Sequence, residues 1–261
     1  MSGDQALHGQ HAVVTGGGSG IGAAVAAALL RGGARVTLMG RDLARLQAQC
    51  AALAALGSVA AQRCDVGDEA SVQGAFEAAA SSDFGPVAVL VNNAGQVQTA
   101  PLARTTLAQW QQMLQVNLTG TFLCTQQVLP GMLAAGQGRI INVASTAALK
   151  GYAYVAAYCA AKHGVLGLTR ALALEVAKKG ITVNAVCPGY TETEIVAQAI
   201  ETITAKTGRT PEQAKQELSA ANPQGRLIQP EEVAQAVAWL ATPGAAAING
   251  QAIAVCGGET A

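Results

Sequence analysis

The apolar positions of the chain follow two alternating patterns. Short runs rich in β-branched residues, such as HAVVT and RIINV, are apolar on both faces of an extended chain, which is typical of strands buried in a parallel sheet. Longer Ala- and Leu-rich stretches between them have helical spacing. The pattern predicts strands at 11–15, 35–39, 59–64, 87–91, 139–143, 181–186 and 252–255. It predicts helices at 20–30, 43–56, 69–80, 107–114 and 118–133, and another that contains YCAAK and ends near residue 178.

Strands that alternate with helices predict an α/β protein with a doubly wound (Rossmann) parallel sheet. We expect about seven strands with helices on both faces, because right-handed crossovers place the helices there. No linker or internal repeat is visible, so we expect residues 1–261 to form a single domain. Residues 191–226 are polar and less regular, and we expect them to form a substrate lid over the carboxyl edge of the sheet.

Composition restricts the functions that this fold can serve. The 261 residues are 51% hydrophobic and 3% aromatic, so the core is built from Ala, Val, Leu and Ile. Lys+Arg and Asp+Glu number 16 each and form no basic stripe, so we expect no nucleic-acid partner. No apolar run approaches the ~20 residues that span a bilayer, and MSGDQALHGQ lacks the pattern of a signal peptide. The six scattered cysteines predict free thiols, a cytoplasmic location and no metal site.

A glycine-rich turn, TGGGSGIG, follows the first predicted strand. Gly16 permits a sharp turn, Gly20 lets the backbone approach a pyrophosphate, and Gly22 lets the next helix pack close to the sheet. Ser19 lies inside this turn, and Ile21 opens the helix. The position between the first strand and the first helix predicts a dinucleotide-binding site.

The end of the second strand indicates which dinucleotide binds. A carboxylate there would hold the ribose 2′-hydroxyl of NAD, but the sequence has Gly40 followed by Arg41. A guanidinium binds a 2′-phosphate through charge-assisted hydrogen bonds, so the sequence favours NADP. NAD stays possible, because Asp42 is one residue further on and Ser19 supplies no second cation.

Tyr158 and Lys162 in YCAAK are spaced i, i+4 and therefore share a helix face. A nearby ammonium and a cationic nicotinamide both stabilise a phenolate, and moving the pKa of a tyrosine from ~10 to near 7 takes roughly 4 kcal/mol. Tyr158 could then exchange a proton with a carbonyl or an alcohol near neutral pH. Ser145 closes the fifth strand and would meet the same substrate oxygen. Asn117, at a predicted helix start, offers an amide for a water or backbone bridge toward Lys162.

These motifs as a set resemble the short-chain dehydrogenase/reductase family. The resemblance covers residues from about 10 to 257 and includes TGGGSGIG, CDV, NNAG, YCAAK and PGYTET. It implies that Tyr158 is the general acid/base, that Lys162 lowers its pKa and holds the nicotinamide ribose, that Ser145 polarises the carbonyl and that Asn117 positions a relay water. It also implies cofactor contacts along the adenine, sheet and nicotinamide sides from Asp65, Val66, Asn92, Ala94, Gly95, Pro188, Gly189, Thr191 and Thr193.

Within that family, GRIINVAST, KHGVLGLTRALALE and INGQAIAVCGG are similar to ketoreductases of β-keto thioesters, including aromatic-polyketide reductases. The resemblance implies hydride transfer between a nicotinamide cofactor and a secondary alcohol or ketone, of the 3-hydroxyacyl/3-oxoacyl thioester type. Similar reductases of fatty-acid synthesis carry basic residues before the fifth strand for docking an acidic carrier protein. Here that stretch is AAGQGR, with Gly136 and Gln137, and only Lys178 and Lys179 supply positive charge nearby. A coenzyme A thioester or a free ketone therefore stays open as the substrate.

Two alternatives and an assembly state follow from the same residues. One alternative is an NAD-dependent polyol, sugar or steroid dehydrogenase, and the other is a catalytically silent dinucleotide-binding sensor. The apolar faces of residues 118–133 and 165–176 exceed what one sheet layer must cover. Together with the family resemblance, they imply a homotetramer.

Overall fold

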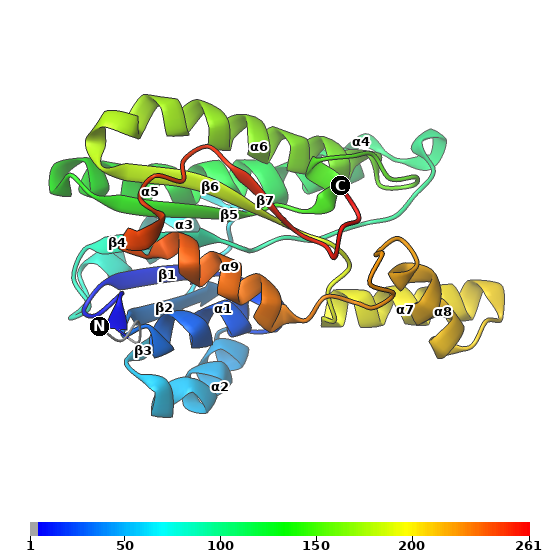
Figure 1. Ribbon diagram of the computed structural model, residues 1–261, viewed down its shortest axis with the longest axis horizontal. Coiled ribbons are helices and arrows are strands. Elements are labelled where there is room, and N and C mark those ends of the chain that lie inside the picture. Colours follow the sequence, from blue (N-terminus) through cyan, green and yellow to red (C-terminus); the bar gives the residue numbers. More distant parts are fainter. Residues whose placement is uncertain (1–4) are drawn as a thin grey trace.

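The computed structural model describes residues 5–261, which form one parallel sheet with helices on both faces (Figure 1). The strand order is β3-β2-β1-β4-β5-β6-β7, and the chain reverses its direction of progress between β1 and β4. The strands are β1 (His11–Thr15), β2 (Arg35–Gly40), β3 (Val59–Arg63), β4 (Val87–Asn92), β5 (Gly138–Val143), β6 (Ile181–Pro188) and β7 (Ala252–Val255). The predicted parallel sheet of seven strands is confirmed, and its switch point marks the edge where such folds bind ligands.

The helices form two layers and one outlying pair (Figure 1). One face of the sheet carries α1 (Gly20–Arg31), α2 (Leu43–Leu53) and α9 (Pro230–Ala241). The other carries α3 (Glu69–Ala80), α4 (Leu107–Leu114), α5 (Gly120–Ala135) and α6 (Ala156–Val176). Beyond the edge of the sheet lie α7 (Glu194–Thr207) and α8 (Pro211–Ser219). Short 3-10 turns occupy Ala54–Leu56, Leu102–Arg104, Thr146–Ala148, Ala177–Lys179 and Pro243–Ala245.

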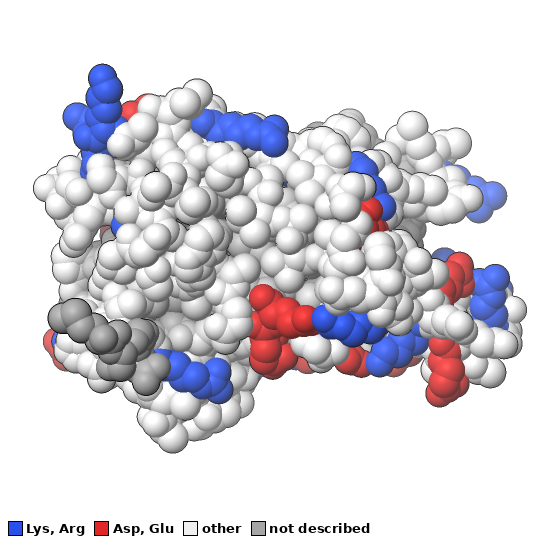
Figure 2. Space-filling model, in the orientation of Figure 1, with Lys and Arg blue, Asp and Glu red and all other residues white. Residues whose placement is uncertain are grey.

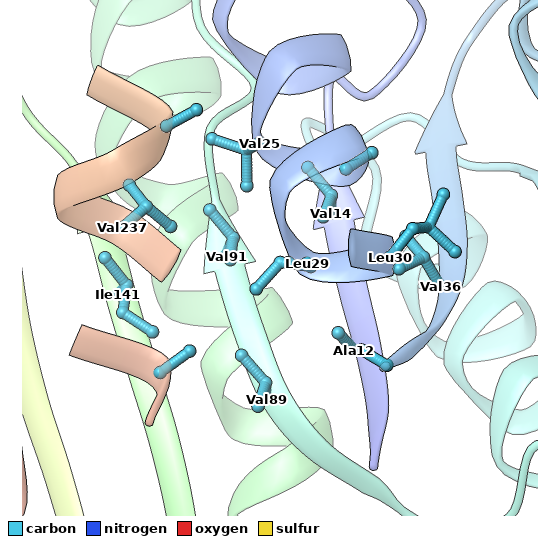
Figure 3. Packing of buried hydrophobic residues seen from close by; sticks show 14 of the residues in the cluster. Ala12, Val14, Val25, Leu29, Leu30, Val36, Val89, Val91, Ile141 and Val237 are labelled. Atoms are coloured by element: carbon cyan, nitrogen blue, oxygen red, sulfur yellow. The ribbon is translucent and has the colours of Figure 1, made fainter. Parts of the chain in front are cut away.

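Buried aliphatic side chains fix α1 and α9 on the sheet (Figure 3). Val14 of β1 and Val91 of β4 are fully buried, as are Leu29 of α1 and Val237 of α9, which pack in the same cluster. Burying each of these side chains contributes about 1.5–3 kcal/mol. The start of α1, which carries the glycine-rich turn, is therefore held rigidly above β1.

The sequence analysis assigned no element to residues 227–251, where the structure has α9. This helix begins with Pro230 at its first position, and the Glu232 side chain accepts a hydrogen bond from the Gln229 backbone N–H at 2.7 Å. Val233 and Val237 recur at helical spacing and pack in the cluster shared with α1. Both the cap and the spacing were present in the sequence as helix signals.

A second difference concerns the two helices expected at 107–114 and 118–133. The structure joins α4 to α5 through a π-helical turn, Gln115–Thr119, in place of an end and a restart. Asn117 lies inside this turn and is fully buried, so the expectation that it begins a helix is wrong. π turns are frequent at functional sites, and this one projects the Asn117 side chain toward the segment that follows β4, as its hydrogen bonds show below.

His11, at the edge of the sheet opposite the glycine-rich turn, gives a pH-dependent contribution to stability. Its Nδ1 lies 2.7 Å from the Gly85 carbonyl and its Nε2 lies 2.9 Å from Thr37 Oγ1. Burial lowers the pKa of His11. As the pH falls below about 6.5, the unfolded chain therefore takes up this proton before the folded protein does, and stability is lost toward acid pH.

We therefore expect the free energy of unfolding to fall more steeply from about pH 7 to about pH 5 in the wild type than in a His11→Gln variant. Urea denaturation at several pH values measures both slopes. Parallel slopes would show that His11 does not carry this dependence.

Charged side chains are sparse on the face shown in Figure 2: some Lys and Arg stand alone, and both signs lie together along the lower right of the view. Within residues 5–261, no helix combines the length and apolarity needed to cross a membrane. The same residues contain no cluster of three or more His, Cys, Asp or Glu that could hold a metal ion. All six cysteines are free thiols. The expectation that MSGDQALHGQ is not a signal peptide falls partly on residues 1–4, which lie outside the described residues.

Candidate active site

The glycine-rich turn has a geometry that side chains would disrupt. Gly16 and Gly20 adopt φ values of +65° and +52°, which L-residues with a Cβ disfavour. A Cβ at Gly22 would lie 2.2 Å from the Gly16 carbonyl oxygen. Ser19 is the N-cap of α1, and Ile21, in the first turn of this helix, packs against the hydrophobic core. The backbone N–H groups at this helix start are therefore accessible to a phosphate at close range.

Asn93 braces this turn, although the sequence analysis did not name it as a site residue. Its Nδ2 donates hydrogen bonds to the carbonyls of Thr15, at 3.0 Å, and Gly16, at 3.2 Å. Thr15 Oγ1 accepts hydrogen bonds from the backbone N–H groups of Asn93 and Ala94, both at 3.0 Å. The NNAG segment after β4 is thus tied to the end of β1. Asn93 is the second asparagine of NNAG, so this motif was the sequence feature that could have indicated its role.

A groove of about 510 Å³ opens beside the turn. Its lining combines the turn with the carboxyl end of β2 and the start of α2, and comprises Gly16, Gly18, Ser19, Gly40, Arg41, Asp42, Arg45 and Leu46. Arg41 is therefore where the sequence predicted it. Asp42 caps α2, since its Oδ1 accepts from the Arg45 backbone N–H at 3.0 Å, which leaves it less suited to hold a ribose. Arg45 adds a second cation that the sequence analysis overlooked.

The remaining residues expected on the adenine side lie at the carboxyl ends of neighbouring strands. Asp65 follows β3, and its Oδ1 accepts from the Gly67 backbone N–H at 3.0 Å, next to the buried Val66. Asn92 differs from the rest, because its side chain is buried between β4 and α5. Its Nδ2 donates to Thr125 Oγ1 at 3.1 Å and to Asn142 Oδ1 at 2.9 Å, so Asn92 supports the site from within the sheet.

Helix α6 brings Tyr158, Lys162 and the end of β5 together. Lys162 Nζ lies 5.7 Å from the centroid of the Tyr158 ring and donates a hydrogen bond to the Val143 carbonyl at 2.9 Å. Val143 ends β5, and Ser145 follows two residues later with its Oγ accepting from the Ala147 N–H at 3.0 Å. Ser145 is also close enough to Tyr158 for its side chain to lower the pKa of the phenol, against the larger rise caused by burial. The three side chains therefore meet at one edge of the sheet.

The side chains of Asn117 and Lys162 both lie close to Gly95. A Cβ at Gly95 would lie 2.8 Å from Asn117 Oδ1 and 3.7 Å from Lys162 Nζ, which explains the need for glycine there. Asn117 Oδ1 accepts from the Gln96 N–H at 3.2 Å, and its Nδ2 donates to the carbonyls of Gln96, at 2.9 Å, and Met113, at 3.0 Å. The side chain of Asn117 therefore anchors the segment after β4, and its partners are backbone groups.

Burial shifts the pKa values of Tyr158 and Lys162 at this edge of the sheet. Burial raises the pKa of Tyr158 to about 12, and the interaction with Ser145 only partly opposes that rise. Burial lowers the pKa of Lys162 to about 8. Burial therefore favours the neutral forms of both side chains in the protein by itself. The expectation that Lys162 and a cationic nicotinamide together bring the pKa of Tyr158 near neutrality concerns the protein with its cofactor bound and stays a prediction.

The segment after β6 crosses from the sheet to the glycine-rich turn. Pro188 ends β6 and Gly189 follows it. Thr191 is buried and its Oγ1 donates to the Gly189 carbonyl at 3.0 Å. Thr193 is the N-cap of α7, and its Cγ2 would lie 3.2 Å from a Cβ at Gly20. The start of α7 therefore lies against the turn that we expect to hold a pyrophosphate.

A buried carboxylate near the carboxyl end of the chain was not foreseen. The Glu259 side chain is only 2% exposed and pairs with Lys150 Nζ at 3.1 Å. It also accepts a hydrogen bond from the Tyr152 hydroxyl, which lies 2.7 Å from Thr146 Oγ1. The Tyr152 ring packs edge to face with Tyr190 at 6.4 Å between centroids. These contacts fix one wall beside the 3-10 turn that follows Ser145.

Comparisons with known proteins place this geometry in a family. The sequence model described as short chain dehydrogenase matches residues 10–204. A Streptomyces coelicolor protein that carries the name of a ketoacyl reductase is 44% identical over 250 residues, covering 95% of each chain. D-threitol dehydrogenase of Mycolicibacterium smegmatis is 40% identical over 260 residues, covering 98% of this chain and 95% of its own.

Among solved structures, a variant of actinorhodin polyketide ketoreductase with NADPH superposes with a TM-score of 0.93. It is 41% identical, and the match covers 99% of this chain and 98% of that one. The fold, the glycine-rich turn and the Ser145–Tyr158–Lys162 group thus agree with one assignment. The chain belongs to the short-chain dehydrogenase family and is an oxidoreductase acting on alcohol and carbonyl groups.

Proposed function

We propose that the protein transfers hydride between NADP and a secondary alcohol/ketone pair, with ketone reduction as the favoured use. The observation that carries this proposal is the meeting of Ser145, Tyr158 and Lys162 at the carboxyl edge of the sheet. This edge also carries the glycine-rich turn and a groove with two arginines. Relatives named as ketoacyl reductases support the same chemistry.

The residues present fit a dinucleotide. The turn is so tight that a Cβ at Gly16 or Gly22 would collide with neighbouring backbone and with Asn93. Helix α1 begins there, and its first N–H groups can bind a phosphate. The turn would hold the pyrophosphate, Arg41 the adenosine side, and the segment from Pro188 to Thr193 the nicotinamide side. When bound, NADP supplies or accepts the hydride at its nicotinamide ring.

In this proposal the protein's own residues manage the proton. The Ser145 hydroxyl donates a hydrogen bond to the substrate carbonyl oxygen, and Tyr158 transfers its phenolic proton to that oxygen as the alcohol forms. A pKa of about 12 keeps Tyr158 protonated at neutral pH, which is the form that a proton donor needs. Lys162, anchored on the Val143 carbonyl, returns a proton to the tyrosine, and Asn117 holds the adjoining segment in place.

We propose 3-oxoacyl thioesters or related ketones as the substrates, because several relatives carry ketoacyl reductase names. The second candidate is an NAD-dependent polyol dehydrogenase, which the similarity to D-threitol dehydrogenase favours. A substrate panel with NADPH, NADH and their oxidised forms, followed by cofactor absorbance, separates the two. Turnover of acetoacetyl-CoA or cyclic diketones with NADPH supports the first candidate, whereas turnover of polyols with NAD alone would overturn it. Cofactor binding without turnover on any member would favour a silent sensor.

The same proposal includes the arrangement of the protein. We propose that residues 1–261 act as one domain, with a substrate lid near 191–226 that contains α7 and α8. Phe122 and Leu133 on α5 and Leu174 on α6 are exposed apolar residues, which supports a homotetramer that buries these helices. We also propose a cytoplasmic location, which the six free cysteines support. Light scattering measures the assembly, and a monomer at micromolar concentration would contradict it.

Arg41→Ala tests the cofactor choice. We expect kcat/KM for NADPH to fall about 10–100-fold, because a charge-assisted contact to the 2′-phosphate is lost. The value for NADH should change less than about threefold, since that cofactor carries no such phosphate. Steady-state kinetics with one ketone and both cofactors measures the two ratios, and an equal loss for both cofactors would assign Arg41 a structural role only.

A further inference from the structure

We infer that Arg45 is a second anchor for the 2′-phosphate of NADP, and that Glu194 of helix α7 competes with that phosphate for the Arg45 guanidinium. This inference rests on the proposed use of NADP. It adds a specificity-determining residue to the cofactor site and links the site to the segment proposed as the substrate lid.

Arg45 is built into the groove rather than attached at its rim. It lines the groove together with Arg41 and the glycine-rich turn. A Cβ at Gly18 would lie 3.4 Å from Arg45 Cγ, so the aliphatic part of the side chain packs across the turn. The backbone of Arg45 is fixed by the Asp42 cap at 3.0 Å. The guanidinium is therefore delivered to the groove from a rigid helix start.

The charge balance of the groove favours a dianion. Its lining contains two arginines and one acid, Asp42, whose Oδ1 is engaged in the cap. Arg63, at the end of the neighbouring strand β3, donates from Nε to the Arg41 carbonyl at 3.3 Å. This hydrogen bond fixes the backbone that carries Arg41. Two guanidinium groups on one groove can bind separate oxygens of a phosphate, as planar forks do.

Glu194 already occupies the position of an anion on Arg45. It is the first residue of α7, and its Oε1 pairs with Arg45 Nη2. The two side chains are 57% and 46% exposed, and exposed ion pairs contribute little to stability. The preceding residue, Thr193, lies against Gly20 of the turn. A phosphate entering the groove therefore meets a guanidinium whose present partner is weakly held and is part of α7.

Competition for one guanidinium makes the two events thermodynamically linked. The factor by which an intact Arg45–Glu194 pair weakens phosphate binding equals the factor by which bound phosphate weakens that pair. Removing the Glu194 charge should consequently tighten a ligand that carries a 2′-phosphate and leave one that lacks it unchanged.

The experiment compares adenosine 2′,5′-bisphosphate with 5′-ADP, by isothermal titration calorimetry at low ionic strength. Four proteins are compared: the wild type, Arg45→Gln, Glu194→Gln and the double variant. Glu217→Gln is the matched control, because Glu217 forms a similarly exposed pair with Arg209 in the same segment. Circular dichroism checks that each variant is folded.

We expect Arg45→Gln to weaken the bisphosphate about tenfold and 5′-ADP less than about twofold. Glu194→Gln should tighten the bisphosphate roughly three- to fivefold, and this gain should disappear in the Arg45→Gln background. The control should match the wild type. A wild type that binds both ligands equally would overturn the NADP assignment and this inference with it. A wild type that prefers the bisphosphate, with an Arg45→Gln variant that keeps the preference, would overturn this inference alone.

Discussion

A Tyr158→Phe variant is expected to lose about 10²–10⁴-fold in kcat for ketone reduction while its affinity for NADPH stays within about twofold. The substitution removes one hydroxyl and keeps the ring that faces Lys162 Nζ at 5.7 Å. The remaining Ser145 hydroxyl can polarise the carbonyl, but the phenolic proton that Tyr158 would transfer is no longer present. Initial rates of NADPH absorbance decrease at saturating ketone measure kcat, and nicotinamide fluorescence measures cofactor binding.

Tyr154→Phe is the control for this experiment. Tyr154 is close in the chain, is 65% exposed and loses the same hydroxyl. It should retain wild-type turnover. Near-normal turnover in Tyr158→Phe, or an equal loss in both variants, would remove the basis for assigning Tyr158 as the proton donor.

A Gly22→Ala variant is expected to lose about 3 kcal/mol or more in the free energy of unfolding, and to bind NADPH far more weakly. The added methyl would lie 2.2 Å from the Gly16 carbonyl oxygen and 2.6 Å from Asn93 Nδ2. Backbone cannot move aside as a flexible side chain can, so α1 must shift away from the turn. Thermal and urea unfolding measure the stability, and fluorescence titration measures the cofactor.

Gly74→Ala provides the opposite result for the same chemical change. Gly74 lies on the exposed side of α3, and a Cβ there meets no atom within 4 Å. An alanine in that position should stabilise the protein by about 0.5–1 kcal/mol through its helix propensity. A destabilisation of similar size in both variants would mean that the close approach at Gly22 is not the cause.

The sheet was predictable because its strands are apolar on both faces. HAVVT is buried at every position and was assigned with the bounds that the structure has. Helix α9 was overlooked although its signals were local, since the region near it was judged as irregular. The π turn around Asn117 was beyond reach, because its sequence is compatible with an ordinary helix end and only packing selects the wider turn.

The site residues divide in the same way. The glycine-rich turn and the YCAAK spacing carry their chemistry in local sequence, so their placement could be predicted. Arg45 faces the groove because α2 starts at the end of β2, which is a tertiary fact. The electrostatics of Tyr158 divide in the same way: the charge of Lys162 is visible in the sequence, whereas the burial that raises the pKa of Tyr158 to about 12 is not.

The hydrogen bonds of Asn93 to Thr15 and Gly16 hold the glycine-rich turn in a fixed position. The glycine-rich turn, where we propose that a dinucleotide binds, is hydrogen-bonded to the segment after β4, so its backbone can shift little. In the function that we propose, residues 194–219, which lie beyond the edge of the sheet, accommodate substrates of different size. Exchanging residues 194–219 between homologues is therefore a way to change substrate selectivity while the cofactor-binding turn stays unchanged.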